Sequence, residues 1–186
     1  MAEDMEGRID AIVDGGPCSV GVESTIVDLT ETPPRLLRPG GITLEQLESV
    51  LGRVEVDQAV TRLMSAGEKP RAPGMKYRHY APKAPVTVVA GPPERTAEHI
   101  ARSLTPGDGV ICFDEFAGEF PGCQIQRMGP AGDKSAQARH IFDALRAFDH
   151  TEVPRIWAQC PDPSGLGLAI NNRLNKAAGF HIVEVK

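Results

Sequence analysis

The stretch VTVVAGPPERTAEHIARSLTPGDGVICFD, residues 86–114, decides the fold of this chain. Its two apolar runs, at 86–90 and 109–114, are continuous rather than alternating, which is typical of parallel strands covered on both faces. Between them the sequence predicts a helix over about 93–104, which ends near Pro106-Gly107. A strand, a helix and a strand in this order indicate a parallel α/β sheet.

The same alternation continues to the end of the chain. Further strands are predicted at CQIQRM (123–128), RIWAQC (155–160) and HIVEV (181–185), and further helices over about 134–148 and 167–178. Strands that alternate with helices require crossover connections, which place helices on both faces of the sheet. We therefore expect residues 86–186 to form a Rossmann-like open parallel sheet with helices on both faces.

The first piece, residues 1–67, is shorter and less complete. Strands are predicted at 8–14 and 21–29, with a short one in the RLLR segment before Pro39-Gly40-Gly41. A helix is predicted over 43–52, with Thr43 and Gln46 as its capping box and with one apolar face, formed by Leu44, Leu47, Val50 and Leu51. A piece of this size buries only about 60% of its unfolded surface, so it is marginal alone.

The linker, residues 68–85, contains RAPGMKYRHYAP (71–82). Its prolines restrict the backbone, so we expect a semi-rigid path without regular structure. Two tyrosines, a histidine and two cations within six residues are unusual for a spacer. This composition indicates either interdomain packing or contact with a base, a ribose or phosphates.

Bulk properties exclude several classes of protein. With 186 residues the chain has room for one or two domains, and its net charge of -5 argues against a general nucleic-acid coat. No apolar run is long enough to span a membrane, and the acidic start lacks a signal peptide's apolar region. The four cysteines form no CxxC pair, so no protein-bound metal site is expected. These features favour a cytoplasmic protein.

Two glycine-containing loops invite a phosphate-binding interpretation. GPAGDKS (129–135) lacks the glycine spacing of a phosphate loop, and Asp133 would repel phosphate, so we predict a plain turn with Asp133 as a helix cap. Gly165 and Gly167 enter the last helix, whose start could hold an anion. A lone GxG is weak evidence, and the alternative is that this helix's asparagines and Arg173 dock against neighbouring loops or the first piece.

Ser24, Thr25 and Arg38 are the candidate binding residues of the first piece. Hydroxyls on a strand offer donors and acceptors to a polar ligand. An arginine held by a Pro-Gly-Gly turn is a suitable bidentate partner for phosphate or carboxylate. Taken alone, these residues could equally be an ordinary surface arginine and strand hydroxyls.

Four segments in order carry a resemblance to a known family. They are RIDAIVDGGPCSVGVESTIVDL (8–29), RLLRPGGIT (35–43), RAPGMKYRHYAP (71–82) and GLGLAINNRLNKAA (165–178). The chain resembles the L-threonylcarbamoyladenylate synthases in their long, two-domain form over nearly its whole length. The resemblance implies that residues 1–67 are the carboxy-terminal part of a YrdC-like catalytic domain, followed by an ordered linker and a Rossmann-like domain.

The resemblance also implies a reaction and its binding residues. The family condenses L-threonine, bicarbonate and ATP to L-threonylcarbamoyl-AMP and pyrophosphate, and a separate complex transfers the threonylcarbamoyl group to tRNA. ATP is then a substrate, with which a magnesium ion can enter, and tRNA is only an indirect partner. Ser24 and Thr25 would belong to the threonine end of the pocket, and Arg38, Tyr77 and His79 to the ATP end. No catalytic nucleophile is expected.

This sequence departs from the family's pattern ahead of Arg8. The family carries there a long segment with a Lys/Arg motif and a threonine-rich strand, so we expect an incomplete site, an inactive chain and self-association of the first piece through uncovered strand edges. Two alternatives stay open. One is a non-catalytic module that binds a nucleotide or a partner, and the other is a carbamoyltransferase-type relative.

Overall fold

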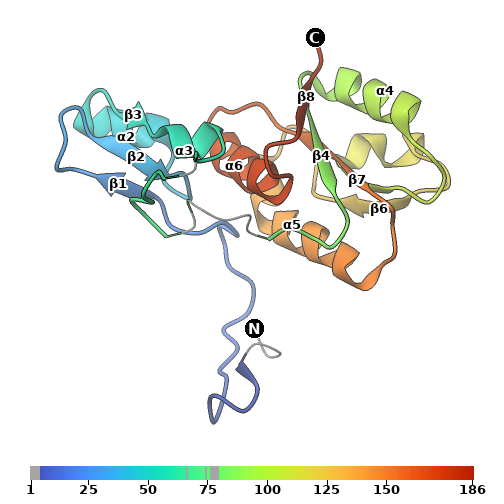
Figure 1. Ribbon diagram of the computed structural model, residues 1–186, viewed down its shortest axis with the longest axis horizontal. Helices are drawn as coiled ribbons and strands as arrows, with labels where there is room; N and C mark the ends of the chain where they lie inside the picture. Colours follow the sequence, from blue (N-terminus) through green and yellow to red (C-terminus); the bar gives the residue numbers. More distant parts are fainter. Residues whose placement is uncertain (1–4, 66, 74, 76–79) are drawn as a thin grey trace.

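The structure is a computed structural model that describes residues 5–65, 67–73, 75 and 80–186 (Figure 1). It contains two separate sheets, one in each half of the chain. In Figure 1 the smaller sheet lies at the left and the larger at the right, with helix α6 on the side of the larger sheet that faces the smaller one. Among the described residues, no helix is long and apolar enough to cross a membrane.

The larger sheet consists of five strands, and all of its pairings are parallel. The strands lie in the order β6-β5-β7-β4-β8. Their bounds are β4 Val86–Ala90, β5 Gly109–Cys112, β6 Gln124–Arg127, β7 Ile156–Cys160 and β8 Ile182–Glu184. The α/β prediction and all five predicted strands are confirmed, with ends that differ by one or two residues.

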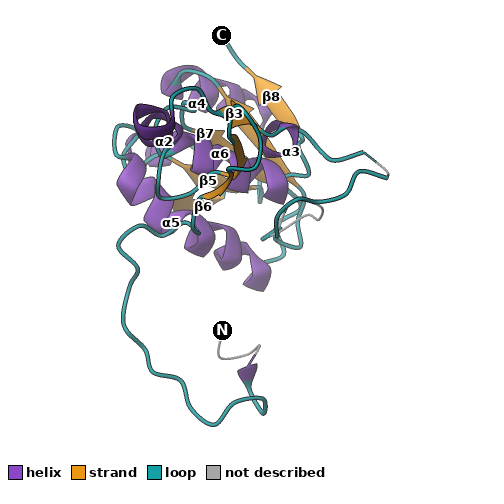
Figure 2. Ribbon diagram, turned by 90° about the vertical axis from the view of Figure 1, so that its left-hand side faces the viewer, coloured by secondary structure: helices purple, strands orange, loops and turns teal. Residues whose placement is uncertain are grey.

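Helices cover both faces of this sheet, as predicted. Helices α5 (Lys134–Arg146) and α6 (Gly167–Ala177) pack on one face, and α4 (Pro93–Ser103) packs on the other (Figure 2). Short 3₁₀ helices follow β5 and α5, at Asp114–Glu119 and Ala147–His150. Neighbouring residues of β4 serve opposite cores, since Val88 belongs to the α5/α6 side and Val89 to the α4 side. This double burial explains why the strand is apolar without alternation.

The smaller sheet has three strands and little covering. Its elements are β1 Ile26–Asp28, β2 Arg35–Arg38, α2 Leu44–Leu51, β3 Glu55–Val56 and α3 Gln58–Thr61. Strand β2 pairs antiparallel with β1 and parallel with β3. A small core forms where Leu37, Ala59, Ala72 and Met75 meet, so the linker supplies two of its four buried residues.

Two local predictions for the first piece have opposite outcomes. The capping box of α2 is confirmed, because the Thr43 side chain accepts from the Gln46 amide and the Gln46 side chain accepts from the Thr43 amide. The predicted strand at 8–14 is wrong, because these exposed residues form an irregular segment with a turn at Arg8 and a bend at Asp10, drawn below the body in Figure 1. A strand requires a neighbour to satisfy its backbone groups, and none of the described residues provides one there.

Candidate functional site

Ser24 and Arg38, which the sequence singled out separately, contact each other. The Arg38 guanidinium donates to the Ser24 carbonyl from Nε and to the Ser24 hydroxyl from Nη2, each at 2.9 Å. Strand pairing creates this contact, since Ile26 lies opposite Arg38 in the β1–β2 register. Gly40 allows the turn after Arg38 to lie against residues 23–25, just ahead of β1, because a Cβ atom there would lie 2.2 Å from the Glu23 carbonyl oxygen.

Thr25 holds the turn that follows Arg38. Its hydroxyl donates to the Ile42 carbonyl at 2.7 Å and accepts from the Ile42 amide at 3.0 Å. These two hydrogen bonds tie the end of the Pro-Gly-Gly segment to the residues just ahead of β1. The strand predicted over 21–29 forms only at Ile26–Asp28, so Ser24 and Thr25 precede it rather than lie in it. The Thr25 hydroxyl therefore positions backbone beside the site in this structure.

Glu23 and Arg173 form an ion pair that sequence reasoning missed. Arg173 on α6 donates from Nε to Glu23 Oε2 at 2.6 Å, and only 3% of its side chain is exposed. It also donates to the Pro39 carbonyl at 3.2 Å. Arg173 therefore contacts both Glu23, next to Ser24, and Pro39, next to Arg38. The Tyr80 hydroxyl of the linker donates to the other oxygen of Glu23. Glu23 thus joins the first piece, the linker and the larger sheet's layer of helices.

Among the described residues, positive charge exceeds negative charge around this pair. Burial raises the pKa of Glu23, but the hydrogen bond from Tyr80 and the charge of Arg173 outweigh it, so the pKa lies below its usual value. Lys176, one turn along α6, is 7% exposed. Burial, together with the charges of Arg173 and Arg38, lowers its pKa to about 8. Arg38, Arg173 and Glu23 all act electrostatically on Lys176, so three cations and one carboxylate lie near one another, which suits an anionic ligand.

The described part of the linker is packed rather than free. Arg71 bonds Asp28 at 2.5 Å and Glu31 at 2.6 Å, and Met75 is 6% exposed in the small core. The Tyr80 ring lies 4.6 Å from the ring of Phe142 on α5. Tyr77 and His79, predicted to contact ATP, lie outside the described residues.

Helix α6 docks against the first piece, so the docking interpretation of its polar residues is confirmed. The Asn172 side chain donates to the Val60 carbonyl at 2.7 Å. Just ahead of the helix, the Gly165 amide donates to the Glu45 carboxylate at 3.0 Å. This hydrogen bond is the largest cause of the lowered pKa of Glu45. The anion at the start of α6 is therefore a side chain of α2.

The GPAGDKS segment is a helix-capping turn, as predicted. Asp133 accepts from the Ala136 amide at 2.9 Å and caps α5. The Lys134 ammonium is engaged by Asp162 and Ser164, at 2.8 Å and 2.7 Å from their side-chain oxygens. The side chains of Asp133 and Lys134 are therefore both occupied by contacts within the protein.

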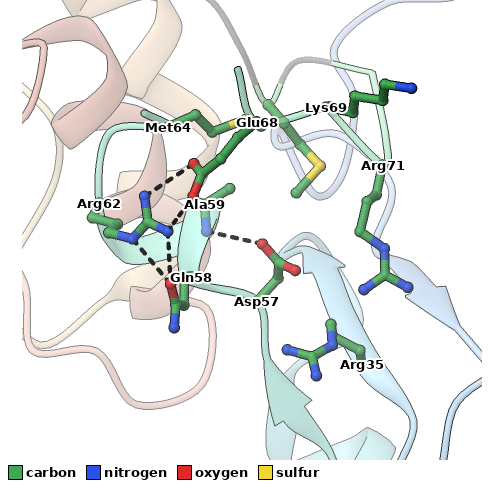
Figure 3. Close-up of a pocket in the computed structure, with 10 residues that line it drawn as sticks. Arg35, Asp57, Gln58, Ala59, Arg62, Met64, Glu68, Lys69 and Arg71 are labelled. Atoms are coloured by element: carbon green, nitrogen blue, oxygen red, sulfur yellow. Dashed lines mark hydrogen bonds and ion pairs between the residues drawn. The ribbon is translucent and has the colours of Figure 1, made fainter. Parts of the chain in front are cut away.

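A separate hollow lies between α3, β2 and the linker (Figure 3). It has a volume of about 250 Å³. Figure 3 shows Arg62 directed toward Glu68 and Gln58 on one side, with Arg35 and Arg71 on the other. Each of these arginines is paired with a carboxylate: Arg62 with Glu68, Arg35 with Glu31 and Glu55, and Arg71 with Asp28 and Glu31. Their charges are therefore neutralised locally, and this hollow is a poorer anion site than the one beside Arg38.

The two buried cysteines do not supply a nucleophile to this site. Cys112 and Cys160 are buried, and burial raises the pKa of each thiol to about 12, so neither is a ready nucleophile. Within the described ranges no group of three His, Cys, Asp or Glu residues could hold a metal ion.

Comparison with known proteins decides the family. Residues 42–179 match the family described as "Threonylcarbamoyl-AMP synthase, C-terminal domain". The chain belongs to this family. Residues 1–40 match a second family, described as "Telomere recombination".

Individual relatives agree with this family. Threonylcarbamoyl-AMP synthase of Bacillus subtilis (strain 168) is 44% identical over 186 residues, and the matched region covers 98% of this chain and 53% of the relative. The enzyme of the same name from Pyrococcus abyssi is 43% identical over 189 residues, covering 100% of this chain and 54% of the relative. This chain therefore spans about half the length of the curated relatives that it matches.

Solved structures match the fold as well. The crystal structure of P. abyssi Sua5 complexed with L-threonine has a TM-score of 0.78 at 40% identity and covers all of this chain and 54% of that one. The structure of a P. abyssi Sua5 variant, with a histidine and a tyrosine changed to alanine, has a TM-score of 0.86 at the same identity and covers 99% and 53%.

Proposed function

We propose that this chain contributes to an enzyme that makes L-threonylcarbamoyl-AMP and pyrophosphate from L-threonine, bicarbonate and ATP. Membership of the threonylcarbamoyl-AMP synthase family supports the reaction. The observation that supports the place of the reaction is the Ser24–Arg38 contact. The buried cations Arg173 and Lys176 lie beside it, and Tyr80 of the linker is bonded to the adjacent Glu23.

Each candidate residue has a role in this proposal. Ser24 lies at the threonine end of the pocket, with Thr25 as its neighbour there, and Arg38 contacts the ATP phosphates. Tyr77 and His79 of the linker contact the nucleotide. Threonylcarbamate oxygen attacks the α-phosphorus, the α–β phosphoanhydride breaks, and pyrophosphate leaves. Such a transfer depends mainly on positioning and on charge stabilisation, which buried cations supply.

The remaining parts of the proposal concern organisation and surroundings. We assign residues 1–67 to the carboxy-terminal part of a YrdC-like catalytic domain, 68–85 to the linker and 86–186 to a Rossmann-like domain. Magnesium would enter with ATP, and the product would pass to a separate complex that modifies tRNA in the cytoplasm.

The test measures pyrophosphate release that depends on both threonine and bicarbonate. It is applied to the full-length product of the same gene, with the 186-residue chain in parallel. We expect release from the former and its loss in Arg38→Ala, while Arg53→Ala, which changes an arginine whose side chain is 79% exposed, serves as the matched control. Release that needs neither threonine nor bicarbonate would refute the proposal. Mass spectrometry of the product distinguishes a carbamoyltransferase, which would yield carbamoyl adenylate.

A second candidate function is a non-catalytic module that binds a nucleotide or a partner. The core of the larger sheet favours it, because the buried members of both of its clusters lie within residues 84–178, and Val22 of the first piece is only a partly buried neighbour of one of them. Calorimetry of the 186-residue chain with ATP separates the two. Binding that Arg38→Ala abolishes favours the synthase site, and binding that survives this change favours a site on the larger sheet.

A further inference from the structure

A second pocket opens at the carboxyl edge of the larger sheet, away from the Ser24–Arg38 contact. Its volume is about 320 Å³, at the lower end of the range for small-molecule sites. It lies where three strands end, since Ala90, Cys160 and Glu184 are the last residues of β4, β7 and β8 and all three line it. Helix α6 forms one wall, and Val60 and Thr61 at the end of α3 form part of the rim.

The position of this pocket follows from the topology. Strands β4 and β7 are neighbours, but the chain leaves them in opposite directions: β4 leads to α4 on one face and β7 leads to α6 on the other. In open parallel sheets such a divergence leaves a crevice outside the carboxyl ends of the two strands, and ligands bind there. The pocket therefore occupies the place where a sheet of this kind most often holds a small molecule.

Carboxamides dominate the polar lining of the pocket. Asn171, Asn172 and Asn175 all line it from α6. Asn171 Oδ1 accepts from the Cys160 thiol at 2.9 Å, and Asn172 Nδ2 is bound to the Val60 carbonyl. Asn175 Oδ1 is buried and has no hydrogen-bond partner among the described residues. A buried acceptor without a partner is unfavourable, so a ligand that lets this oxygen turn toward a donor would be favoured.

The charges of the lining restrict the ligand class. No lysine or arginine is among the described residues that line the pocket, and its one charged group is the Glu184 carboxylate. A phosphate group would therefore meet a negative charge without a compensating cation. Ala90, Leu168 and Ile182 add apolar walls. Carboxamides match the donor and acceptor edge of a purine, apolar walls match its ring faces, and a carboxylate can accept from ribose hydroxyls.

We propose that this pocket binds a nucleoside without its phosphates, of which adenosine is the simplest probe. In the bound state the Asn175 side chain turns so that its Oδ1, which is buried in the free protein, accepts from the exocyclic amine of the base, and Glu184 accepts from the ribose hydroxyls. The rim residues Val60 and Thr61 belong to the first piece, so an occupied pocket contacts both halves of the chain. This site is independent of the proposed synthase chemistry, because it shares no lining residue with the Ser24–Arg38 contact.

The test is a titration of the 186-residue chain with adenosine, followed by calorimetry and by amide chemical shifts. We expect saturable binding with Kd below about 1 mM. The shifts of Ala90, Cys160 and Glu184 should move, and those of Ser24 and Arg38 should not. AMP should bind more weakly than adenosine, and inorganic phosphate should not compete.

Variants assign the binding to the pocket. Asn175→Leu should weaken adenosine binding at least tenfold, and Glu184→Gln, which changes an exposed side chain, should weaken it less and provides a readout if Asn175→Leu does not fold. The matched control is Gln124→Leu, which removes an exposed carboxamide from β6 at the far edge of the same sheet. Arg38→Ala should leave adenosine binding unchanged. The proposal is overturned if adenosine fails to bind, or if Arg38→Ala abolishes binding while Asn175→Leu and Glu184→Gln preserve it.

Discussion

Helices α2 and α6 both carry apolar residues at helical spacing, but only α6 buries them. In α6, Ile170 and Leu174 are fully buried against the larger sheet. In α2 no residue is buried, and Val50 is 83% exposed. The difference shows that periodicity predicts a helix and its apolar face, whereas burial of that face depends on another surface to cover it. For α2, the described residues cover that face only in part, at Leu44 and Leu47.

The two regions therefore owe their order to different interactions. The larger sheet is held by a core on each face, in which Ile111, Phe113 and Ile156 are fully buried. Helix α2 depends on its capping box and on the Glu45–Gly165 contact. The larger sheet should lose much stability when a single core side chain is truncated. Helix α2 should respond mainly to changes at its ends and at its contacts with the segment that leads into α6.

The largest expected effect is in the core of the larger sheet. Leu174→Ala should lower the free energy of unfolding by about 2–5 kcal/mol, because it leaves a cavity in a fully packed region. Val50→Ala in α2 should change it by less than about 0.5 kcal/mol, since an exposed side chain leaves no cavity. Urea-induced unfolding followed by circular dichroism measures both. Equal losses would contradict the contrast between the two regions.

The next effect concerns the Glu23–Arg173 ion pair, which joins the first piece to α6. Arg173→Met should cost roughly 3 kcal/mol, because it leaves the half-buried Glu23 carboxylate without its counter-charge. Hydrogen exchange in β1 and β2 should accelerate. In a Glu23→Gln background the same substitution should cost clearly less, and a double-mutant cycle with no coupling would show that the pair does not hold the regions together.

A pH effect of roughly 1–2 kcal/mol is expected from Lys176. Its pKa of about 8 lies below the ordinary value of 10.5. The unfolded chain therefore binds more protons between these two values, and this lysine's contribution makes stability rise with pH across that window. The raised thiol pKa values of Cys112 and Cys160 act in the opposite direction there. The informative quantity is thus the difference in slope between the wild type and Lys176→Met, which should vanish if Lys176 has an ordinary pKa.

The smallest effect tests the cap of α2. Thr43→Ala should cost about 1 kcal/mol, because it removes the acceptor for the Gln46 amide. Thr43→Ser retains that hydroxyl and is the matched control. Loss of amide protection in 44–51 on hydrogen exchange would report the fraying. If both variants behave alike, the capping box is not what holds this helix.

Sequence by itself determined the features that depend on near neighbours. Residues 86–90 and 109–114 could be assigned to buried parallel strands because their apolar runs are continuous, and Thr43 could be assigned as a cap from the glutamine three positions later. Ser24 and Arg38 could be selected as candidates from their residue types and from the family's motifs. Their mutual contact follows from the β1–β2 register, which their sequence spacing does not specify.

Tertiary structure alone decided which distant groups meet. Glu23 and Arg173 are 150 positions apart, and neither carries a local signal that names the other. The carboxyl-edge pocket likewise depends on the strand order, because Ala90, Cys160 and Glu184 converge only when β7 and β8 flank β4. Segment 8–14 has the composition of a strand but no partner to pair with among the described residues, so it remains irregular and exposed. Hydrogen bonds within a few residues can be inferred from order along the chain, whereas charge pairs, pockets and burial require the partner surface to be known.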